Sequence, residues 1–206
     1  MSNSSSWIYS SPWVYGLVMR LLYGSHYGSR YESLAGMIPA GVSLVDVCAG
    51  DCRLYTHYLK SKGVSYTALD ISPGFVNSAR KSDIDARQFD ANVDPIPAAD
   101  FIVMQASLYQ FLPDAAPIVR RMLESARQRV LIAEPVRNLS DSNVPVLSGL
   151  SRWLTKPQSG RAGQHGDRFT DESFRSFVCG FSELDQIVPI PGGRELIAVF
   201  RRDHGA

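Results

Sequence analysis

Val45-Asp46-Val47-Cys48-Ala49-Gly50-Asp51-Cys52 is the stretch that decides the fold, because a short apolar run here leads directly into a turn of small residues. The apolar run at 44–48 predicts a buried strand, and the apolar side chains of 53–62 recur at helical spacing. Gly63 follows and offers the left-handed conformation in which many helices end. A strand, a tight turn and a helix in this order begin a βαβ unit.

The same alternation of apolar runs and helical periods continues toward the C-terminus. Further strands are expected at 66–71, 86–89, 101–106, 130–133, 181–190 and 195–201, and helices after Ser72-Pro73, Asp114 and Thr170. The link Pro191-Gly192-Gly193 is too short for a parallel crossover, so the last two strands must be antiparallel. The sequence predicts one α/β domain with a doubly wound, Rossmann-like, seven-stranded sheet that is mostly parallel but has an antiparallel C-terminal strand.

Two segments depart from this rhythm. Residues 1–41 are rich in aromatic side chains, and Trp13, Leu17 and Leu21 follow helical spacing, which predicts an N-terminal helical lid segment before the domain at 42–206. A helix packed on the domain is the plainer interpretation, and a surface-seeking amphipathic helix with peripheral membrane contact is a third. The stretch 138–167 is rich in glycine, proline and serine, which is typical of a functional or disordered loop.

Composition narrows the class of protein. The formal net charge is +1, from 21 basic and 20 acidic residues, so no bulk field attracts nucleic acid. Three cysteines are too few for a disulfide framework, and no second Cys/His pair completes a metal site, so we expect no metal. The polar start is unlike a signal peptide and no apolar run reaches about 20 residues, so we expect a cytoplasmic protein without an integral membrane segment. The sequence does not indicate an oligomeric state.

Three aspartates lie at the predicted carboxyl ends of successive strands. Asp46 is near the end of the first strand, Asp70 closes the second and Asp90 follows the third. Ligands of doubly wound sheets bind at this edge, where an acidic side chain accepts hydrogen bonds from ribose hydroxyls. We therefore expect Asp70 to bind a ribose, Asp90 an adenine amino group, and the edge as a whole a nucleoside cofactor.

Glycine usage at the turn separates the possible cofactors. A turn that binds a dinucleotide needs the glycines of G-x-G-x-x-G, whereas this turn has only Gly50. It would also place the negative charge of Asp51 beside the pyrophosphate of a dinucleotide, which argues against such a cofactor. S-adenosylmethionine carries no phosphate and needs a single close backbone approach. From residue 42 to residue 201 the chain resembles a class I S-adenosylmethionine-dependent methyltransferase of the small-molecule type. The turn of that family is commonly acid-x-G-x-G-x-G, and here Cys48 and Cys52 stand at its first and third glycines.

This resemblance implies a set of cofactor contacts. It assigns the methionine end to Asp46, Cys48, Ala49 and Gly50, the ribose to Asp70, the adenine to Ile71 and Asp90-Ala91, and a place facing the cofactor to Gln105. The final hairpin at 181–201 resembles the antiparallel sixth and seventh strands of the family.

The sequence indicates the catalytic residues less clearly than the cofactor contacts. Many small-molecule methyltransferases have a histidine just after the fourth strand, where this chain reads Ser107-Leu108-Tyr109-Gln110-Phe111. Tyr109 is a candidate for orienting a substrate or else a core tyrosine. His165, in the long loop, is a candidate substrate contact or else an exposed loop residue. Glu134, at the end of the fifth strand, would contact substrate or cap a loop.

The favoured function is methyl transfer from S-adenosylmethionine to a small organic or lipid-like metabolite. The two cysteines at glycine positions and the missing histidine motivate an alternative, a non-catalytic binding protein with the methyltransferase fold. The strand-turn-helix and Asp70 alone support a third interpretation, an NAD(P)-dependent oxidoreductase.

Overall fold

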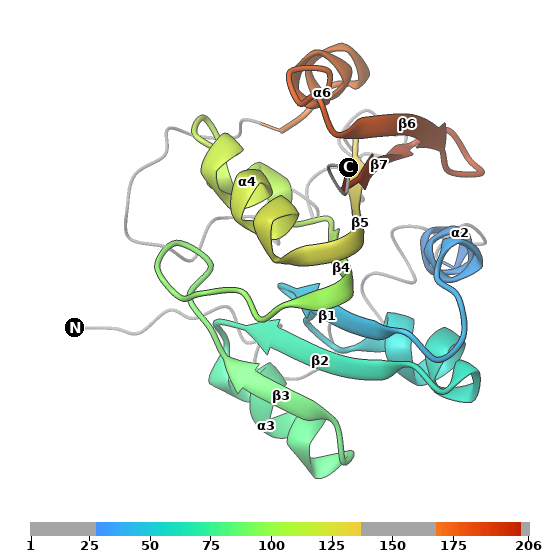
Figure 1. Ribbon diagram of the computed structural model, residues 1–206, viewed down its shortest axis with the longest axis vertical. Helices are drawn as coiled ribbons and strands as arrows, with labels where there is room; N and C mark the ends of the chain where they lie inside the picture. The colour runs from blue at the N-terminus through green and yellow to red at the C-terminus, as the bar shows by residue number, and fades with distance from the viewer. Residues whose placement is uncertain (1–27, 137–167, 203–206) are drawn as a thin grey trace, which may run out of the picture.

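The computed structural model describes residues 28–136 and 168–202. In these ranges it contains a seven-stranded sheet of order β3-β2-β1-β4-β5-β7-β6 (Figure 1). The strands are β1 (Ser43–Val47), β2 (Ser65–Asp70), β3 (Asp85–Gln88), β4 (Ala99–Gln105), β5 (Ala126–Pro135), β6 (Leu184–Pro189) and β7 (Glu195–Arg201). Neighbours among β1 to β5 pair in parallel, and β7 is antiparallel to both β5 and β6. The predicted doubly wound, Rossmann-like sheet is confirmed.

Helical segments cover both faces of this sheet. They are α2 (Ser29–Met37), η2 (Tyr55–Leu59), η3 (Lys60–Lys62), α3 (Pro73–Lys81), η4 (Leu108–Phe111), α4 (Ala116–Ser125) and α6 (Asp171–Val178). Because side chains alternate along a strand, Val45 and Val47 join the apolar cluster that α4 and α6 cover, whereas Leu44 joins the cluster under α2, η2 and α3. Burial of each such side chain stabilises the fold by about 1.5–3 kcal/mol.

The starts of α3 and α4 correct two details of the sequence-based expectation. Pro73 is the first residue of α3 as expected, but the Ser72 hydroxyl makes no capping hydrogen bond. Asp114 is not the cap of α4, which begins at Ala116 after Ala115 with Pro117 in its first turn. The proline has no N–H and a fixed φ, so it suits this position without a side-chain cap.

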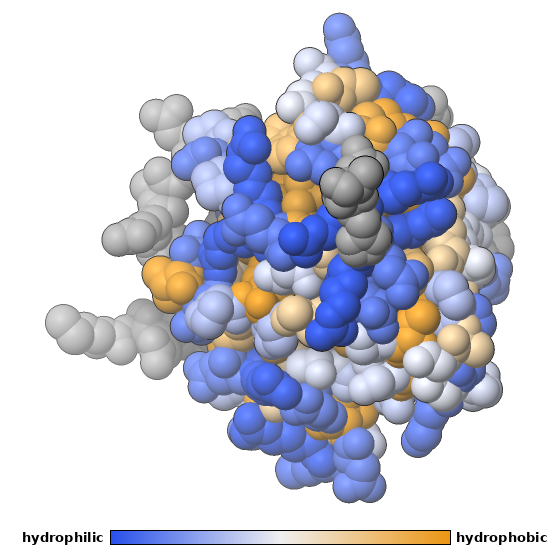
Figure 2. Space-filling model, viewed as in Figure 1, coloured by the Kyte–Doolittle hydropathy of each residue, from blue (hydrophilic) through white to orange (hydrophobic). Residues whose placement is uncertain are grey.

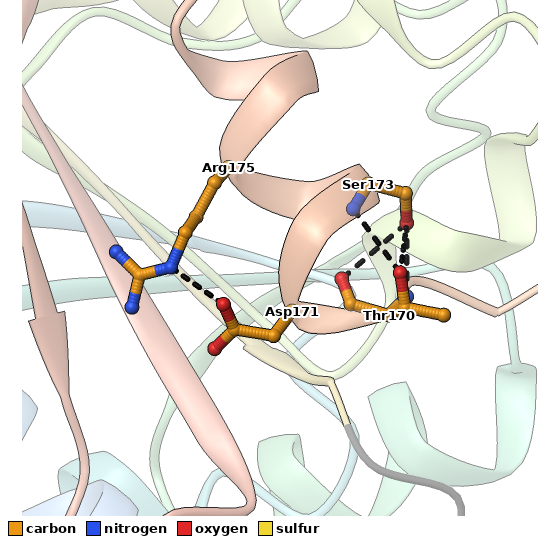
Figure 3. Close-up of polar contacts among 4 residues, drawn as sticks. All are labelled: Thr170, Asp171, Ser173 and Arg175. Atoms are coloured by element: carbon orange, nitrogen blue, oxygen red, sulfur yellow. Dashed lines mark hydrogen bonds and ion pairs between the residues drawn. The ribbon is translucent and has the colours of Figure 1, made fainter.

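Helix α6 begins as predicted. The Thr170 hydroxyl accepts a hydrogen bond from the Ser173 N–H at 3.1 Å, and the Ser173 hydroxyl oxygen accepts one from the Thr170 N–H at 2.9 Å (Figure 3). This reciprocal pair is a capping box. Asp171 then pairs with Arg175 one turn later, at 2.6 Å (Figure 3).

The helix after β1 covers the expected 53–62 and ends at Gly63, which is left-handed with φ 64°. Its centre is wound as a π-helix rather than an α-helix. Both the N–H and the hydroxyl of Thr56 donate to the Cys52 carbonyl, at 3.0 and 3.2 Å. A threonine hydroxyl that competes for a helix carbonyl in this way bends the helix locally.

Part of the N-terminal segment is described, and it is attached to the sheet. Arg30 of α2 donates from Nε to Glu195 Oε2 at 2.6 Å, and its Nη2 also contacts Glu195 Oε1, with both side chains buried. Tyr31 stacks on Tyr58 with ring centroids 5.8 Å apart. The helix expected around Trp13, the long loop at 138–167 and His165 lie outside the described residues.

The surface agrees with apolar clusters that are enclosed between the sheet and the helices on each of its faces. Hydrophilic side chains cover most of the face in view over α3 and β3, and apolar ones show in small separate groups (Figure 2). Within the described ranges, no helix combines the length and the apolar character that crossing a bilayer requires.

Candidate functional site

The turn after β1 has an unusual backbone. Cys48, Gly50 and Cys52 all adopt left-handed conformations, with φ of 60°, 55° and 53°. An L-residue pays roughly 1–2 kcal/mol for this conformation, whereas glycine adopts it freely. The turn is closed by hydrogen bonds from the Ala49 N–H to the Leu69 carbonyl and from the Cys52 N–H to the Ala49 carbonyl. The two cysteines therefore follow a glycine-type backbone path, which explains how the turn keeps its shape without three glycines.

Asp70 fastens this turn to the end of β2. Its Oδ2 accepts a hydrogen bond from the Gly50 N–H at 2.9 Å, and its Oδ1 accepts one from the Ser72 N–H at 2.8 Å. Burial raises the pKa of Asp70, and the two backbone donors lower it in part. The carboxylate expected to bind a ribose is thus held in place by the turn beside it.

Asp46 lies beneath the turn and is fully buried. Its Oδ2 accepts hydrogen bonds from the Tyr66 hydroxyl at 2.9 Å and from Gln105 Nε2 at 3.2 Å. Burial raises the pKa of Asp46 to about 7, although the bonds from Tyr66 and Gln105 act to lower it. Tyr66 in turn stacks on Tyr55, with centroids 4.4 Å apart. The sequence analysis names Asp46 and Gln105 as candidate site residues but does not name Tyr66. Tyr66 meets Asp46 only because β2 pairs with β1, and no motif along the chain indicates that contact.

The loop after β3 continues the same rim. The Phe89 N–H donates to the Asp70 carbonyl at 3.0 Å, so the ends of β3 and β2 lie side by side. Asp90 is half-buried, and its Oδ1 accepts from the N–H and Nδ2 of Asn92 at 2.9 and 2.8 Å. Ile71 leaves 61% of its surface exposed at the end of β2. The structure therefore brings Asp46, Asp70 and Asp90 to the carboxyl ends of three adjacent strands.

The ends of β4 and β5 form the other half of the rim. Tyr109 of η4 is half-buried against the core, and the Arg168 guanidinium lies 4.3 Å from the centroid of its ring. Burial raises the pKa of Tyr109, and the charge of Arg168 lowers it in part. Tyr109 is thus a packed residue at the rim that also contacts a cation.

Glu134 ends β5 as a fully buried carboxyl group. Its Oε2 accepts a hydrogen bond from the Leu108 N–H at 3.0 Å, which caps the first turn of η4. Burial raises the pKa of Glu134 to about 8, and both the Leu108 N–H and the Arg30 charge lower it in part. The raised pKa favours the protonated form of Glu134 near neutral pH, and its Oε1 has no hydrogen-bond partner among the described residues. Of the two roles expected for it, the loop cap is present.

Burial disfavours the thiolate form of both cysteines of the turn. It raises the pKa of the Cys52 thiol to about 12, and it also raises the pKa of the Cys48 thiol. A thiol is a nucleophile and metal ligand mainly as its thiolate. Over the ranges 28–136 and 168–202, no three His, Cys, Asp or Glu side chains gather as a metal site would require.

The rim suits a nucleoside. A Cβ built on Gly50 would meet no atom within 4 Å, so the turn is open there. The Asp70 and Asp90 carboxylates match the hydroxyl and amino donors of a nucleoside, and their negative charge disfavours a pyrophosphate. Ile71 adds an exposed apolar side chain just after β2.

Comparison with known proteins was made by sequence and by structure. No protein-family model matches the sequence, and no curated protein matches it either. The structure is similar to an O-methyltransferase family 2 protein from Planctomyces limnophilus in complex with apigenin, at TM-score 0.61 and 18% identity, over 98% of this chain and 63% of the other. The chain thus spans less than two thirds of that protein.

Two further neighbours are matched over nearly their whole length. One is a putative methyltransferase in complex with the Trm112 methyltransferase activator from Haloferax volcanii, at TM-score 0.69 and 14% identity, covering 95% of this chain and 98% of the other. The second is magnesium protoporphyrin IX methyltransferase from Synechocystis with bound S-adenosylhomocysteine, at TM-score 0.63 and 14% identity, covering 95% and 97%.

A neighbour from Rhodobacter sphaeroides is described instead as a putative zinc-dependent alcohol dehydrogenase, at TM-score 0.62 and 15% identity, covering 89% and 96%. At identities this low the shared feature is the fold, which is that of class I S-adenosylmethionine-dependent methyltransferases.

Proposed function

We propose that this chain is a methyltransferase that transfers the methyl group of S-adenosylmethionine to a small organic or lipid-like metabolite. The observation that carries the proposal is the turn at 48–52. It has three left-handed residues, and Asp70 holds it through the Gly50 N–H at the carboxyl edge of a sheet with the methyltransferase strand order. A turn with this backbone and a single glycine accommodates a ligand without a phosphate.

In this proposal the residues of the β1–β3 rim hold the cofactor. Asp46 and the turn at 48–50 take the methionine end, Asp70 takes the ribose hydroxyls, and Ile71, Asp90 and Ala91 take the adenine. Gln105, which donates to Asp46, faces the cofactor from β4. When bound, S-adenosylmethionine supplies a methyl group on a sulfonium leaving group.

The chain contributes alignment more than acid–base chemistry. Methyl transfer is an in-line displacement, and holding the acceptor atom at near-attack distance supplies much of the acceleration. Tyr109 lies in η4, just after the end of β4, where its hydroxyl would orient an acceptor. The raised pKa of Glu134 would make it a hydrogen-bond donor rather than a general base.

Small organic acceptors are favoured by the fold neighbours, since one is a complex with apigenin and another is named for magnesium protoporphyrin IX. Release of S-adenosylhomocysteine in the presence of a panel of phenols, carboxylic acids and amines tests this class of acceptor. We expect Tyr109→Phe to lower turnover about tenfold while leaving the affinity for S-adenosylhomocysteine within twofold. Unchanged turnover would remove Tyr109 from the proposed acceptor site.

Titration calorimetry and the turnover assay together separate the three functions. A methyltransferase binds S-adenosylhomocysteine and releases it during turnover, and a non-catalytic relative binds it without turnover. An oxidoreductase binds NADH and leaves S-adenosylhomocysteine unbound. Absence of binding at millimolar S-adenosylhomocysteine would overturn the proposed function.

A further inference from the structure

Helix α4 holds the loop that follows β3 by side-chain contacts to its backbone. Arg121 donates from Nη1 to the Ala91 carbonyl at 2.5 Å and from Nη2 to the Asp94 carbonyl. Ser125, one helical turn later, donates from its hydroxyl to the Ile96 carbonyl at 3.1 Å. Figure 1 shows this loop leaving the end of β3 and rising toward α4 before the chain enters β4. We call residues 90–96 the β3–β4 loop.

Inside the β3–β4 loop, Asp94 connects the contacts of Arg121 to Asp90 by hydrogen bonds. Asp94 Oδ2 accepts a hydrogen bond from the Asp90 N–H at 2.7 Å, and the Asp94 N–H donates to the Asp90 carbonyl at 2.9 Å. The carbonyl of Asp94 is the group that Arg121 binds. The backbone on both sides of the Asp90 side chain is therefore tied, through one residue, to a single guanidinium group.

An arginine suits this task better than a lysine. Its planar fork presents several N–H donors in fixed directions, so it binds two carbonyl groups at once, whereas an ammonium group is a compact point charge. The fork also stands on a rigid support, because Met122 and Leu123 beside it are buried in the core. Arg120, the preceding residue, points elsewhere, with its guanidinium 5.6 Å from the centroid of the Phe181 ring.

We infer that Arg121 is a positioning residue for adenine recognition, which it serves by fixing the β3–β4 loop so that the Asp90 carboxylate meets the adenine 6-amino group. The inference rests on the proposed function, in which Asp90 binds the adenine. Arg121 itself does not touch the cofactor. Buried Phe89 and Ile96 anchor the loop at either side, and Asn92 still donates to Asp90 Oδ1. Loss of the fork therefore leaves the loop folded but lets residues 90–94 move as a unit and carry the Asp90 carboxylate out of place.

The test compares two ligands that differ at the 6-position of the purine. S-adenosylhomocysteine presents an amino donor there, and S-inosylhomocysteine presents a carbonyl acceptor. Their dissociation constants are measured by calorimetry for the wild type, Arg121→Met, Arg121→Lys and the matched control Arg120→Met. For the wild type and Arg120→Met we expect S-adenosylhomocysteine to bind about tenfold more tightly. In Arg121→Met the preference falls to about twofold or less, and in Arg121→Lys it is intermediate.

The ratio of the two constants is the readout that a purely structural role would not change. A general loss of stability weakens both ligands alike and leaves the ratio at its wild-type value. If folded Arg121→Met keeps the wild-type ratio, the inference is overturned while the proposed function stands. If Arg121→Met does not fold, the same conclusion follows from a wild-type ratio in Arg121→Lys. Failure of the wild type to bind S-adenosylhomocysteine would instead overturn the proposed function, and with it the premise of this inference.

Discussion

The two halves of the carboxyl edge of the sheet differ in how their polar groups are satisfied. On the β1–β3 rim, both oxygens of Asp70 accept backbone hydrogen bonds, and Asp46 accepts from Tyr66 and Gln105. On the β4–β5 rim, Gln105 Oε1 and Glu134 Oε1 are buried and accept no hydrogen bond from the described residues, 28–136 and 168–202. Buried polar groups are normally paired. The carboxylates of the first half are thus fixed by hydrogen bonds within the chain, whereas the second half holds one amide oxygen and one carboxyl oxygen that make no such bond to the described residues.

This difference fits the two ligands of the proposed function. The turn and the fixed carboxylates of the β1–β3 rim would bind the cofactor. The acceptor would bind beside the β4–β5 rim, near Tyr109 and Arg168. Substitutions of single residues on the two rims test this difference, because each one changes a charge, a hydrogen bond or a backbone conformation.

The largest expected effect is on the pH dependence of stability, through Glu134. An unfolded glutamate loses its proton near pH 4.5, whereas folded Glu134 keeps it up to about pH 8. Between these values the unfolded state binds fewer protons, so the free energy of unfolding falls as pH rises, by about 1.4 kcal/mol per pH unit. Glu134→Gln removes this fall, which amounts to roughly 3 kcal/mol between pH 5.5 and 7.5.

Urea unfolding of the wild type and Glu134→Gln across that range measures the effect. Asp46, with its pKa of about 7, adds a similar fall below pH 7 that both proteins share. Equal slopes for the two proteins would show that Glu134 is ionised in the folded state and that the β4–β5 rim is not as unsaturated as described.

The next effect concerns the cofactor affinity through Asp70. We expect Asp70→Asn to weaken binding of S-adenosylhomocysteine about a hundredfold, because it removes a charged acceptor from both the ribose and the Gly50 N–H. Asp85→Asn is the matched control, since Asp85 is exposed in β3 and pairs with Arg87. Calorimetry that finds equal losses for the two variants would argue against a prebuilt β1–β3 rim.

A smaller effect is the pH dependence of cofactor binding through Asp46. The cationic amino group at the methionine end favours the ionised carboxylate, whose pKa in the free protein is about 7. The affinity for S-adenosylhomocysteine should therefore rise about tenfold from pH 6 to pH 8 and then level off. In Asp46→Asn we expect weaker binding that is flat over this range, and an unchanged pH profile in that variant would assign the titration to another group.

The smallest effect is on the backbone of the turn, through Cys48. Glycine relieves the left-handed strain at this position and valine increases it, so we expect Cys48→Gly to stay within about 1 kcal/mol of the wild type in stability. Cys48→Val should be less stable than Cys48→Gly by about 1–2 kcal/mol. Thermal melts of both variants measure the difference, and equal stability would contradict the glycine-type path of the turn.

Local signals explain which parts of the molecule the sequence predicts. The positions of the strands and the places of Asp46, Asp70 and Asp90 follow from short apolar runs and the residues that end them, whereas the order of the strands in the sheet comes from the structure. Strand pairing brings Tyr66 to Asp46, and helix packing brings Arg121 to the β3–β4 loop. No motif or spacing in the sequence predicts either contact. The expected cap at Asp114 was wrong because Pro117 fixes the start of α4, and the burial of Glu134 depends on η4 packing over the strand end.

The most direct test of the central claim is a map of the amide groups that respond to the cofactor product. In ¹H–¹⁵N correlation spectra of the full chain titrated with S-adenosylhomocysteine, we predict saturable shifts at 48–52, 70–72 and 90–94, with much smaller shifts at 108–111 and 134–136. Shifts centred on 108–111 and 134–136, or none at millimolar ligand, would contradict the assignment of the β1–β3 rim as the cofactor site.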